Sequence, residues 1–124
     1  MVKHTKGRQS NVTEMKQRLL EIQKTMQAVG KDAPEFVSAF MAFKNAAEKE
    51  GVLDKKTKKL IAIALAIATK CEWCVSLHVK EALDAGAKPP EIIEASFVAV
   101  LMGGAPSLMF AQNVLKAVDG LSKQ

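Results

Sequence analysis

The segment from Lys59 to His78 reads KLIAIALAIATKCEWCVSLH, and it decides both the fold class and the chemistry expected of this chain. In its first half, isoleucine and leucine alternate with alanine, a period of two that usually favours a β-strand. Alanine, however, is a poor strand residue and the best helix former, so the sequence predicts a helix buried on all sides. Its alanine surfaces would let neighbouring helices approach closely.

Five further helical patterns surround this segment. The six helices are expected to begin near Val12, Pro34, Asp54, Glu72, Pro89 and Pro106, and glycines are expected to end five of them, at Gly30, Gly51, Gly86, Gly103 and Gly120. In the second helix, Phe36, Phe40 and Phe43 share one face, which we expect to lie in the core. With no convincing strand pattern, the fold class is all-α, a single-domain bundle of about six helices.

The chain divides into a short arm and one domain. Residues 1–10 are polar and basic and lack periodicity, so they are interpreted as a flexible N-terminal arm. Residues 11–124 then form the domain. A chain of 124 residues with 48% hydrophobic residues is large enough for one core.

Composition argues against nucleic-acid and membrane binding. The net charge is +5, but only 5% of residues are aromatic and tyrosine is absent, which leaves few side chains to stack on bases. The longest apolar run, Leu60 to Ala68, is far shorter than the roughly 20 residues that span a bilayer. Two cysteines cannot build a secreted disulfide framework and the chain start shows no signal-peptide pattern, so we expect a cytoplasmic protein.

Both cysteines and one of the two histidines lie between Cys71 and His78. On a helix, residues three apart lie about 5–6 Å from each other, the Cα separation that a disulfide requires. Cys71 and Cys74 could therefore bond and unbond without backbone movement, and His78, one turn beyond Cys74, could take a thiol proton. A helix start also stabilises a thiolate, so the arrangement indicates thiol redox chemistry. The spacing does not decide the nucleophile, because Cys71 should be the more exposed and Cys74 the nearer to His78.

Two other interpretations of the cysteine pair are open. Cys71, Cys74 and His78 are three possible zinc ligands, but a fourth is missing, since His4 belongs to the expected arm. The cysteines could also be inert and buried. We predict neither a metal nor a cofactor, and we expect Trp73 to be a packing or pocket-wall residue.

The chain resembles the carboxymuconolactone decarboxylase superfamily, and specifically its alkyl hydroperoxidase D-like branch, from about Asp54 to Leu121. The resemblance rests on residues 59–74, His78, Ala85-Gly86-Ala87, Glu91-Ile92 and Gly103-Gly104. It implies an all-helical protomer that assembles into trimers or hexamers. It also implies a dithiol that reduces hydroperoxides or other disulfides, with a thiol electron donor, either a dithiol or a redox protein.

The resemblance also implies roles for the site residues. Cys74 matches the peroxide-attacking thiol, Cys71 the resolving thiol, and His78 a member of a proton relay. Two other parts of the relay are absent, because Lys59 replaces a glutamate twelve residues before the first cysteine and Trp73 replaces a histidine before the second. The expected function is therefore a thiol-dependent oxidoreductase, an alkyl hydroperoxide reductase-like peroxidase (peroxiredoxin activity). The alternatives are a small-molecule lyase of the carboxymuconolactone decarboxylase type, whose branch typically lacks the cysteine pair, or a non-redox oligomeric binding protein.

We expect a homo-trimer or homo-hexamer with its site close to a subunit contact. Six short helices carry more apolar stripes than one small bundle conceals easily, so association would bury the remainder. The candidates for the contact are the stripe of the first helix that carries Met15 and Met26 and the stripe that ends at Val118.

Overall fold

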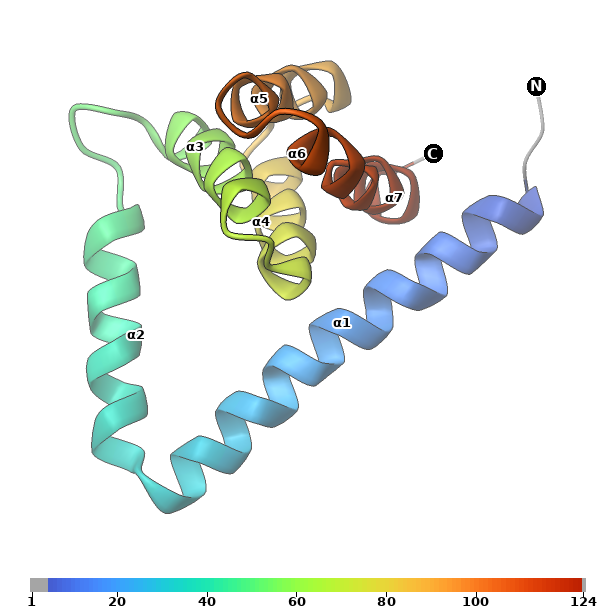
Figure 1. Ribbon diagram of the computed structural model, residues 1–124. Coiled ribbons are helices and arrows are strands. Elements are labelled where there is room, and N and C mark those ends of the chain that lie inside the picture. The colour runs from blue at the N-terminus through green and yellow to red at the C-terminus, as the bar shows by residue number, and fades with distance from the viewer. Residues whose placement is uncertain (1–4, 124) are drawn as a thin grey trace.

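The computed structural model describes residues 5–123, and in that range it contains seven α-helices and no strand (Figure 1). The helices are α1 (Thr5–Asp32), α2 (Pro34–Glu48), α3 (Lys55–Ala68), α4 (Glu72–Asp84), α5 (Pro89–Gly103), α6 (Ala105–Phe110) and α7 (Gln112–Leu121). The predicted all-α fold is confirmed. None of these helices is long and apolar enough to cross a membrane.

The core lies where α3, α4, α5 and α7 meet, with a contribution from α1. Its fully buried large side chains are Met15, Ile63, Ile67, Val75, Val79, Ile92 and Val114. The predicted starts of α2, α3 and α5 are confirmed. Asp54 caps α3 by accepting a hydrogen bond from the backbone N–H of Thr57 (2.8 Å), and prolines stand in the first turns of α2 and α5.

α1 packs along α7, and this contact extends α1 beyond its predicted start. Residues 5–10 are helical, so the expectation of a flexible arm is wrong for them. Arg8 donates a hydrogen bond to the carbonyl oxygen of Ser122, and Asn11 donates one to the carboxylate of Asp119, both at 2.8 Å. These bonds hold the polar first turns of α1 against α7 and its C-cap residue Ser122. Hydrophobic periodicity could not predict this contact, because the side chains that make it are polar.

The two stripes expected to form a subunit contact lie partly in the core of the same chain. Met15 of α1 and Val118 of α7 are buried, so the prediction is wrong for these two residues, whereas Met26 is half-buried and Val29 is exposed. Gly120, which was expected to end the last helix, lies inside α7. A Cβ at this position would come within 2.7 Å of the carbonyl oxygen of Asn11, so only glycine allows the two helices to approach this closely.

α2 stands away from the rest of the bundle and forms a V with α1 (Figure 1). Within the described residues, none of its side chains is buried. Phe36 and Phe43 are 64% and 69% exposed and Phe40 is also exposed, so their predicted place in the core is wrong. The apolar face exists as the periodicity indicates, but no helix among residues 5–123 covers it.

α3 is covered on one side only. Ile63, Ala66 and Ile67 are buried against α4 and α5, whereas Ile61 and Leu65 are exposed. The prediction of a helix buried all round is therefore wrong for the single chain.

The last predicted helix is broken into α6 and α7 at Ala111. The side-chain amides of Gln112 and Asn113 donate to the carbonyl oxygens of Met109 and Phe110, which a continuous helix would use for its own backbone bonds (3.0 Å each). The backbone N–H of Val114 instead donates to the carbonyl oxygen of Ala111 (2.9 Å), which is three residues earlier and not four, as in a 3₁₀-helix.

Candidate functional site

A short turn between α3 and α4 positions the cysteine pair. Lys70 adopts a left-handed conformation with φ of 58°. Its N–H donates to the carbonyl oxygen of Ile67 (3.1 Å), and the N–H of Cys71 donates to that of Ala66 (3.0 Å). These two bonds form a Schellman motif, which ends α3 and reverses the chain. Cys71 is therefore both the last residue of this motif and the N-cap residue of α4.

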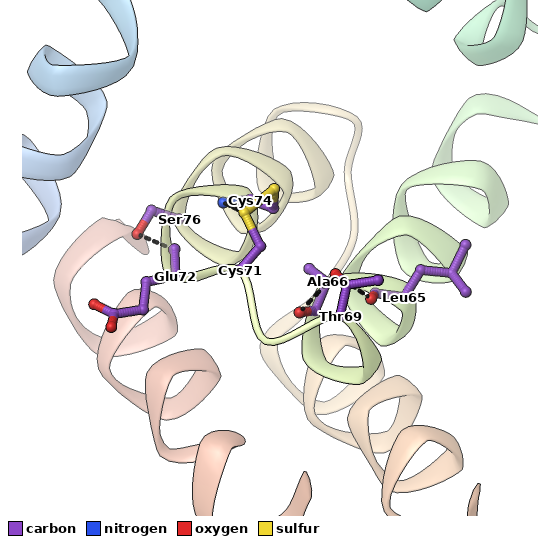
Figure 2. Close-up of a disulfide and its surroundings, with 7 residues drawn as sticks. All are labelled: Leu65, Ala66, Thr69, Cys71, Glu72, Cys74 and Ser76. Carbon is purple, nitrogen blue, oxygen red and sulfur yellow. Dashed lines mark hydrogen bonds between the residues drawn. A yellow bond between two sulfur atoms is a disulfide. The ribbon is translucent and has the colours of Figure 1, made fainter. Parts of the chain in front are cut away.

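Cys71 and Cys74 form a disulfide across the first turn of α4 (Figure 2). Their Cα atoms lie 5.2 Å apart, within the range that the helical spacing predicted. The backbone N–H of Cys74 also donates to the sulfur of Cys71 at 3.2 Å. Because this N–H belongs to the unpaired first turn of the helix, it would equally stabilise a Cys71 thiolate after the bridge is reduced. Both cysteines are half-buried, and Cys74 packs against the hydrophobic core.

His78 lies one turn beyond Cys74 on the same helix, and its side chain is largely buried. Its Nδ1 atom is 3.3 Å from Oε1 of Glu81, which follows three residues later on α4. This is an ion-pair distance, but the angle is too bent for a hydrogen bond, and Nδ1 has no other partner in the part of the chain that the structure describes. The imidazole therefore faces a carboxylate on one of its two nitrogens.

Glu81 belongs to a cluster of four charged side chains from three helices. Lys59 of α3 lies 3.0 Å from both Glu81 and Glu48, and Lys44 of α2 lies 2.7 Å from Glu48 and 3.2 Å from Glu81. Only 10% of the Lys59 side chain is exposed, so its ammonium group depends on these carboxylates to compensate for the loss of water. The cluster joins α2 to the bundle at the helix that carries the cysteines.

The carboxylates of this cluster are held in their ionised form. Burial by itself would raise the pKa of Glu81, but its contacts with His78 and Lys59 and the charges of Lys44 and Lys59 outweigh this effect and lower the pKa to about 2. Burial opposes a similar change at Glu48, where bonds to Lys44 and Lys59 lower the pKa. Burial likewise disfavours the charged form of Lys44, yet its carboxylate partners raise its pKa.

The same cluster contains a set of atoms with metal-ligand character. One ligand atom each from Glu48, His78 and Glu81 lie within 4.8 Å of one another. Both carboxylates, however, already bind the ammonium groups of Lys44 and Lys59, and two positive charges at contact distance oppose a metal cation. The residues therefore fit an ion-pair cluster better than a metal centre.

The zinc site considered from the sequence requires two free thiolates, and here the two sulfurs are bonded to each other. His4, the remaining histidine, lies outside the described residues.

A cavity of about 530 Å³ lies beside the charged cluster. Asn45 and Glu48 of α2, Lys59 of α3, and Glu81 and Asp84 of α4 contribute to its walls. Most of the residues that line the cavity are polar or charged, and they include Glu81 on α4.

Trp73 and Ser76 lie on other faces of α4. Trp73 is half exposed, and its indole N–H donates a hydrogen bond to Glu21 of α1 at 2.8 Å. The Trp73 side chain also lines a separate groove together with Ile22 of α1. This agrees with the predicted pocket-wall role. The hydroxyl of Ser76 is buried and lies 3.2 Å from the sulfur of Met15. It also lies 3.4 Å from the carbonyl oxygen of Glu72 (Figure 2), so Ser76 contributes to the core and not to the disulfide site.

The sequence interpretation missed Lys44, Glu48 and Glu81. A signal for Glu81 was present, because a carboxylate three residues after a histidine on a helix can reach the imidazole. Lys44 and Glu48 gave no local signal, because they come from α2, a helix separated in sequence from α4 by the whole of α3. Lys59 was identified only as a departure from the family pattern, and its two carboxylate partners explain how a lysine is tolerated there.

Two other proteins are similar to this chain in sequence. An uncharacterised protein of Cupriavidus necator is 36% identical over 110 residues, which cover 89% of this chain and 97% of that protein. Uncharacterised protein 4 of the cox locus of Paracoccus denitrificans is 41% identical over 81 residues, which cover 65% of this chain and 73% of that protein.

Solved structures share the fold as well. The crystal structure of lpg0406, a carboxymuconolactone decarboxylase family protein of Legionella pneumophila, matches with a TM-score of 0.85 and 38% identity, covering 89% of this chain and 98% of that one. The model of the carboxymuconolactone decarboxylase family itself matches residues 34–117. The cysteine pair at the start of α4 is consistent with the alkyl hydroperoxidase D-like branch. The chain therefore belongs to the carboxymuconolactone decarboxylase family.

Proposed function

We propose that this protein is a thiol-dependent oxidoreductase of the alkyl hydroperoxidase D-like type, in which Cys71 and Cys74 cycle between a dithiol and a disulfide. The observation that carries the proposal is the Cys71–Cys74 disulfide across the first turn of α4. The two cysteines already lie at the Cα separation of a disulfide, so the bridge can open and close with little movement of the helix.

The proposed substrate is a small hydroperoxide, which is reduced in two steps. The Cys74 thiolate attacks one peroxide oxygen and the O–O bond breaks, so that the sulfur is oxidised to a sulfenic acid and the other oxygen leaves, with a proton, as an alcohol or water. The Cys71 thiol then attacks the same sulfur, forms the disulfide and releases water. A small disulfide can enter the cycle instead: the Cys74 thiolate attacks one of its sulfurs, and the other half of the disulfide leaves as a thiol. The Cys71 thiol then attacks the mixed disulfide at Cys74, forms the Cys71–Cys74 bridge and releases the remaining half as a second thiol.

A dithiol or a redox protein would restore the enzyme. Its thiolate attacks the bridge, and its second thiol resolves the mixed disulfide, so the donor supplies two electrons and two protons and is itself oxidised to a disulfide. The N–H bond to Cys71 supports Cys71 as the leaving thiolate in this step. We place the cycle in the cytoplasm, where thiol donors keep catalytic dithiols reduced.

His78 is the proposed base of the cycle. It lies one turn from Cys74 and is the one histidine among residues 5–123, so it is the side chain best suited to take the thiol proton. Replacing it with alanine is expected to slow turnover by about 10²-fold or more, which is the usual effect of losing a general base.

We further propose that the protein is a homo-trimer or homo-hexamer. The exposed phenylalanines of α2 and the exposed Ile61 and Leu65 of α3 support this proposal, because a monomer would leave them in water. We propose that the interface lies on α2 and α3 and not on the stripe residues Met15 and Val118, which are buried. α2 also carries Lys44 and Glu48, so this contact would lie close to the charged cluster.

A peroxide-consumption assay tests the proposed activity. Reduced wild-type protein with a dithiol donor should consume tert-butyl hydroperoxide catalytically, and Cys74→Ser should abolish turnover. Mass spectrometry after one equivalent of peroxide should show loss of two protons per chain without covalent dimers. Failure of the wild type to react with either the hydroperoxide or a small disulfide would contradict the proposed function.

A further inference from the structure

We propose that Glu81 is the positioning residue for His78, and that Lys44 and Lys59 hold it in that role. The Glu81 carboxylate would bind the proton on Nδ1 of the imidazole and so leave Nε2 as the basic nitrogen that accepts the thiol proton. This inference rests on the proposed function, because it concerns how the base of that cycle is prepared. It adds a residue that the cysteine–histidine spacing does not predict.

The geometry places one imidazole nitrogen against an anion. Nδ1 of His78 is 3.3 Å from Oε1 of Glu81 and has no other hydrogen-bond partner among residues 5–123. A neutral imidazole carries one proton, and the nitrogen that faces a carboxylate is the one that keeps it. The free lone pair is then on Nε2, the nitrogen at the far end of the ring.

The charged groups around His78 come from three helices, and those of α2 and α3 affect His78 by holding Glu81 in place. Glu81 lies on the same helix as His78, Lys59 approaches from α3, and Lys44 and Glu48 approach from α2. Two ammonium groups hold the carboxylate of Glu81 in one place and keep it ionised. A carboxylate fixed in this way favours the imidazolium ion that forms when His78 takes the proton.

An alternative is that Glu81 only compensates the charge of Lys59 and Lys44. The two roles differ in what they change. A purely structural carboxylate affects stability, whereas a positioning carboxylate also determines which nitrogen of His78 is protonated.

The tautomer of His78 gives the first test, and it requires no enzymatic turnover. The chain has two histidines, so long-range ¹H–¹⁵N spectra of reduced protein, with a His4→Gln variant for assignment, resolve the His78 ring. Neutral His78 in the wild type should be protonated on Nδ1, and Glu81→Gln should shift it toward the Nε2-protonated form. A wild-type ring already protonated on Nε2 would overturn the proposal without any need for a variant.

The pH dependence of thiol reactivity gives the second test. The rate at which reduced protein reacts with a small disulfide is measured from pH 5 to pH 9 for the wild type, Glu81→Gln and Glu81→Asp. Removing the carboxylate weakens the base, so Glu81→Gln should be about 10-fold slower or more and the acid limb of its profile should move to lower pH. Glu81→Asp, which keeps the charge, should recover part of the rate.

Glu91→Gln provides the matched control. Glu91 also pairs with a lysine (Lys56, 3.0 Å) and accepts a backbone N–H bond, but it lies on α5 outside the cluster. Its loss should leave the pH profile unchanged. If Glu81→Gln has the same pH–rate profile and the same His78 tautomer as the wild type, Glu81 is not a positioning residue, even if the wild type is active. If the wild type reacts with no disulfide or peroxide, the proposed function fails instead, and the tautomer still reports on Glu81.

Discussion

The ammonium nitrogen of Lys59 lies 3.0 Å from the carboxylate of Glu81, so two helices of this protein are joined by an ion pair beside His78. Lys59 is the position at which the alkyl hydroperoxidase D-like pattern has a glutamate. The carboxylate that this position lacks is present on the neighbouring helix. The Lys59 ammonium group is therefore paired with an opposite charge on a residue that it contacts.

Replacing Lys59 with methionine should destabilise the protein at pH 7. The change leaves Glu48 and Glu81 close together with only Lys44 to neutralise them, and we expect a loss of about 2 kcal/mol. Urea unfolding followed by circular dichroism measures this loss. The control is Lys56→Met, because the Lys56–Glu91 pair is more exposed, at 38% and 39%, and should contribute about 0.5 kcal/mol. Equal losses in the two variants would contradict a special role for the cluster.

The stability of the protein should fall in acid as Glu81 takes up a proton. The pKa of Glu81 is about 2 in the folded protein, compared with an ordinary value of 4.5. Because the folded-state value is the lower one, the stabilisation is fully present above pH 4.5 and is lost as the pH falls from 4.5 toward 2. The urea midpoint of the wild type should therefore decline through this window more steeply than that of Glu81→Gln. Parallel curves would show that Glu81 does not contribute.

Much of the fold could be predicted from local patterns. Alanine at alternate positions distinguished a helix from a strand in residues 59–68, and prolines and glycines marked most helix ends. The disulfide was predictable because both cysteines lie on one helix, where spacing fixes distance.

What could not be predicted depends on contacts between distant parts of the chain. The apolar face with Phe36 and Phe43 was correctly recognised, but periodicity does not say whether the same chain or another copy covers such a face. The partners of Lys59 lie on α2 and α4, and no local pattern connects those helices. The break at Ala111 depends on two side-chain amides that compete for backbone carbonyl groups.

The two cysteines should give different products when each is removed. In Cys71→Ser, Cys74 can still attack a hydroperoxide but has no partner thiol, so one sulfenic acid per chain should accumulate. A sulfenic-acid-specific dimedone adduct, mapped to Cys74 by mass spectrometry, measures this product. Cys74→Ser is the matched control and should form little adduct at Cys71. The reverse pattern would exchange the two roles.

Gly120→Ala should destabilise the contact between α1 and α7. The new methyl carbon would lie 2.7 Å from the carbonyl oxygen of Asn11, so the helices must separate, and we expect a loss of about 2 kcal/mol. Gly30→Ala is the control, because its nearest neighbour is a side-chain methyl carbon of Val37 at an ordinary 3.8 Å. That substitution should stabilise α1 by about 0.5 kcal/mol, since alanine is the better helix former. Thermal unfolding of the two variants checks both signs.

The assembly should depend on the phenylalanine face of α2. Phe43 is 69% exposed in the single chain, so Phe43→Glu should cost the monomer little, yet it would place a charge inside an interface that uses this face. Light scattering coupled to size exclusion should give a trimer or hexamer for the wild type and a smaller mass for Phe43→Glu, with unchanged helix content.

Ser38→Glu adds the same charge on the opposite face of α2 and should assemble like the wild type. A wild-type mass near one chain of 13.4 kDa at micromolar concentration would contradict the assembly, and an unaffected Phe43→Glu oligomer would move the interface away from α2.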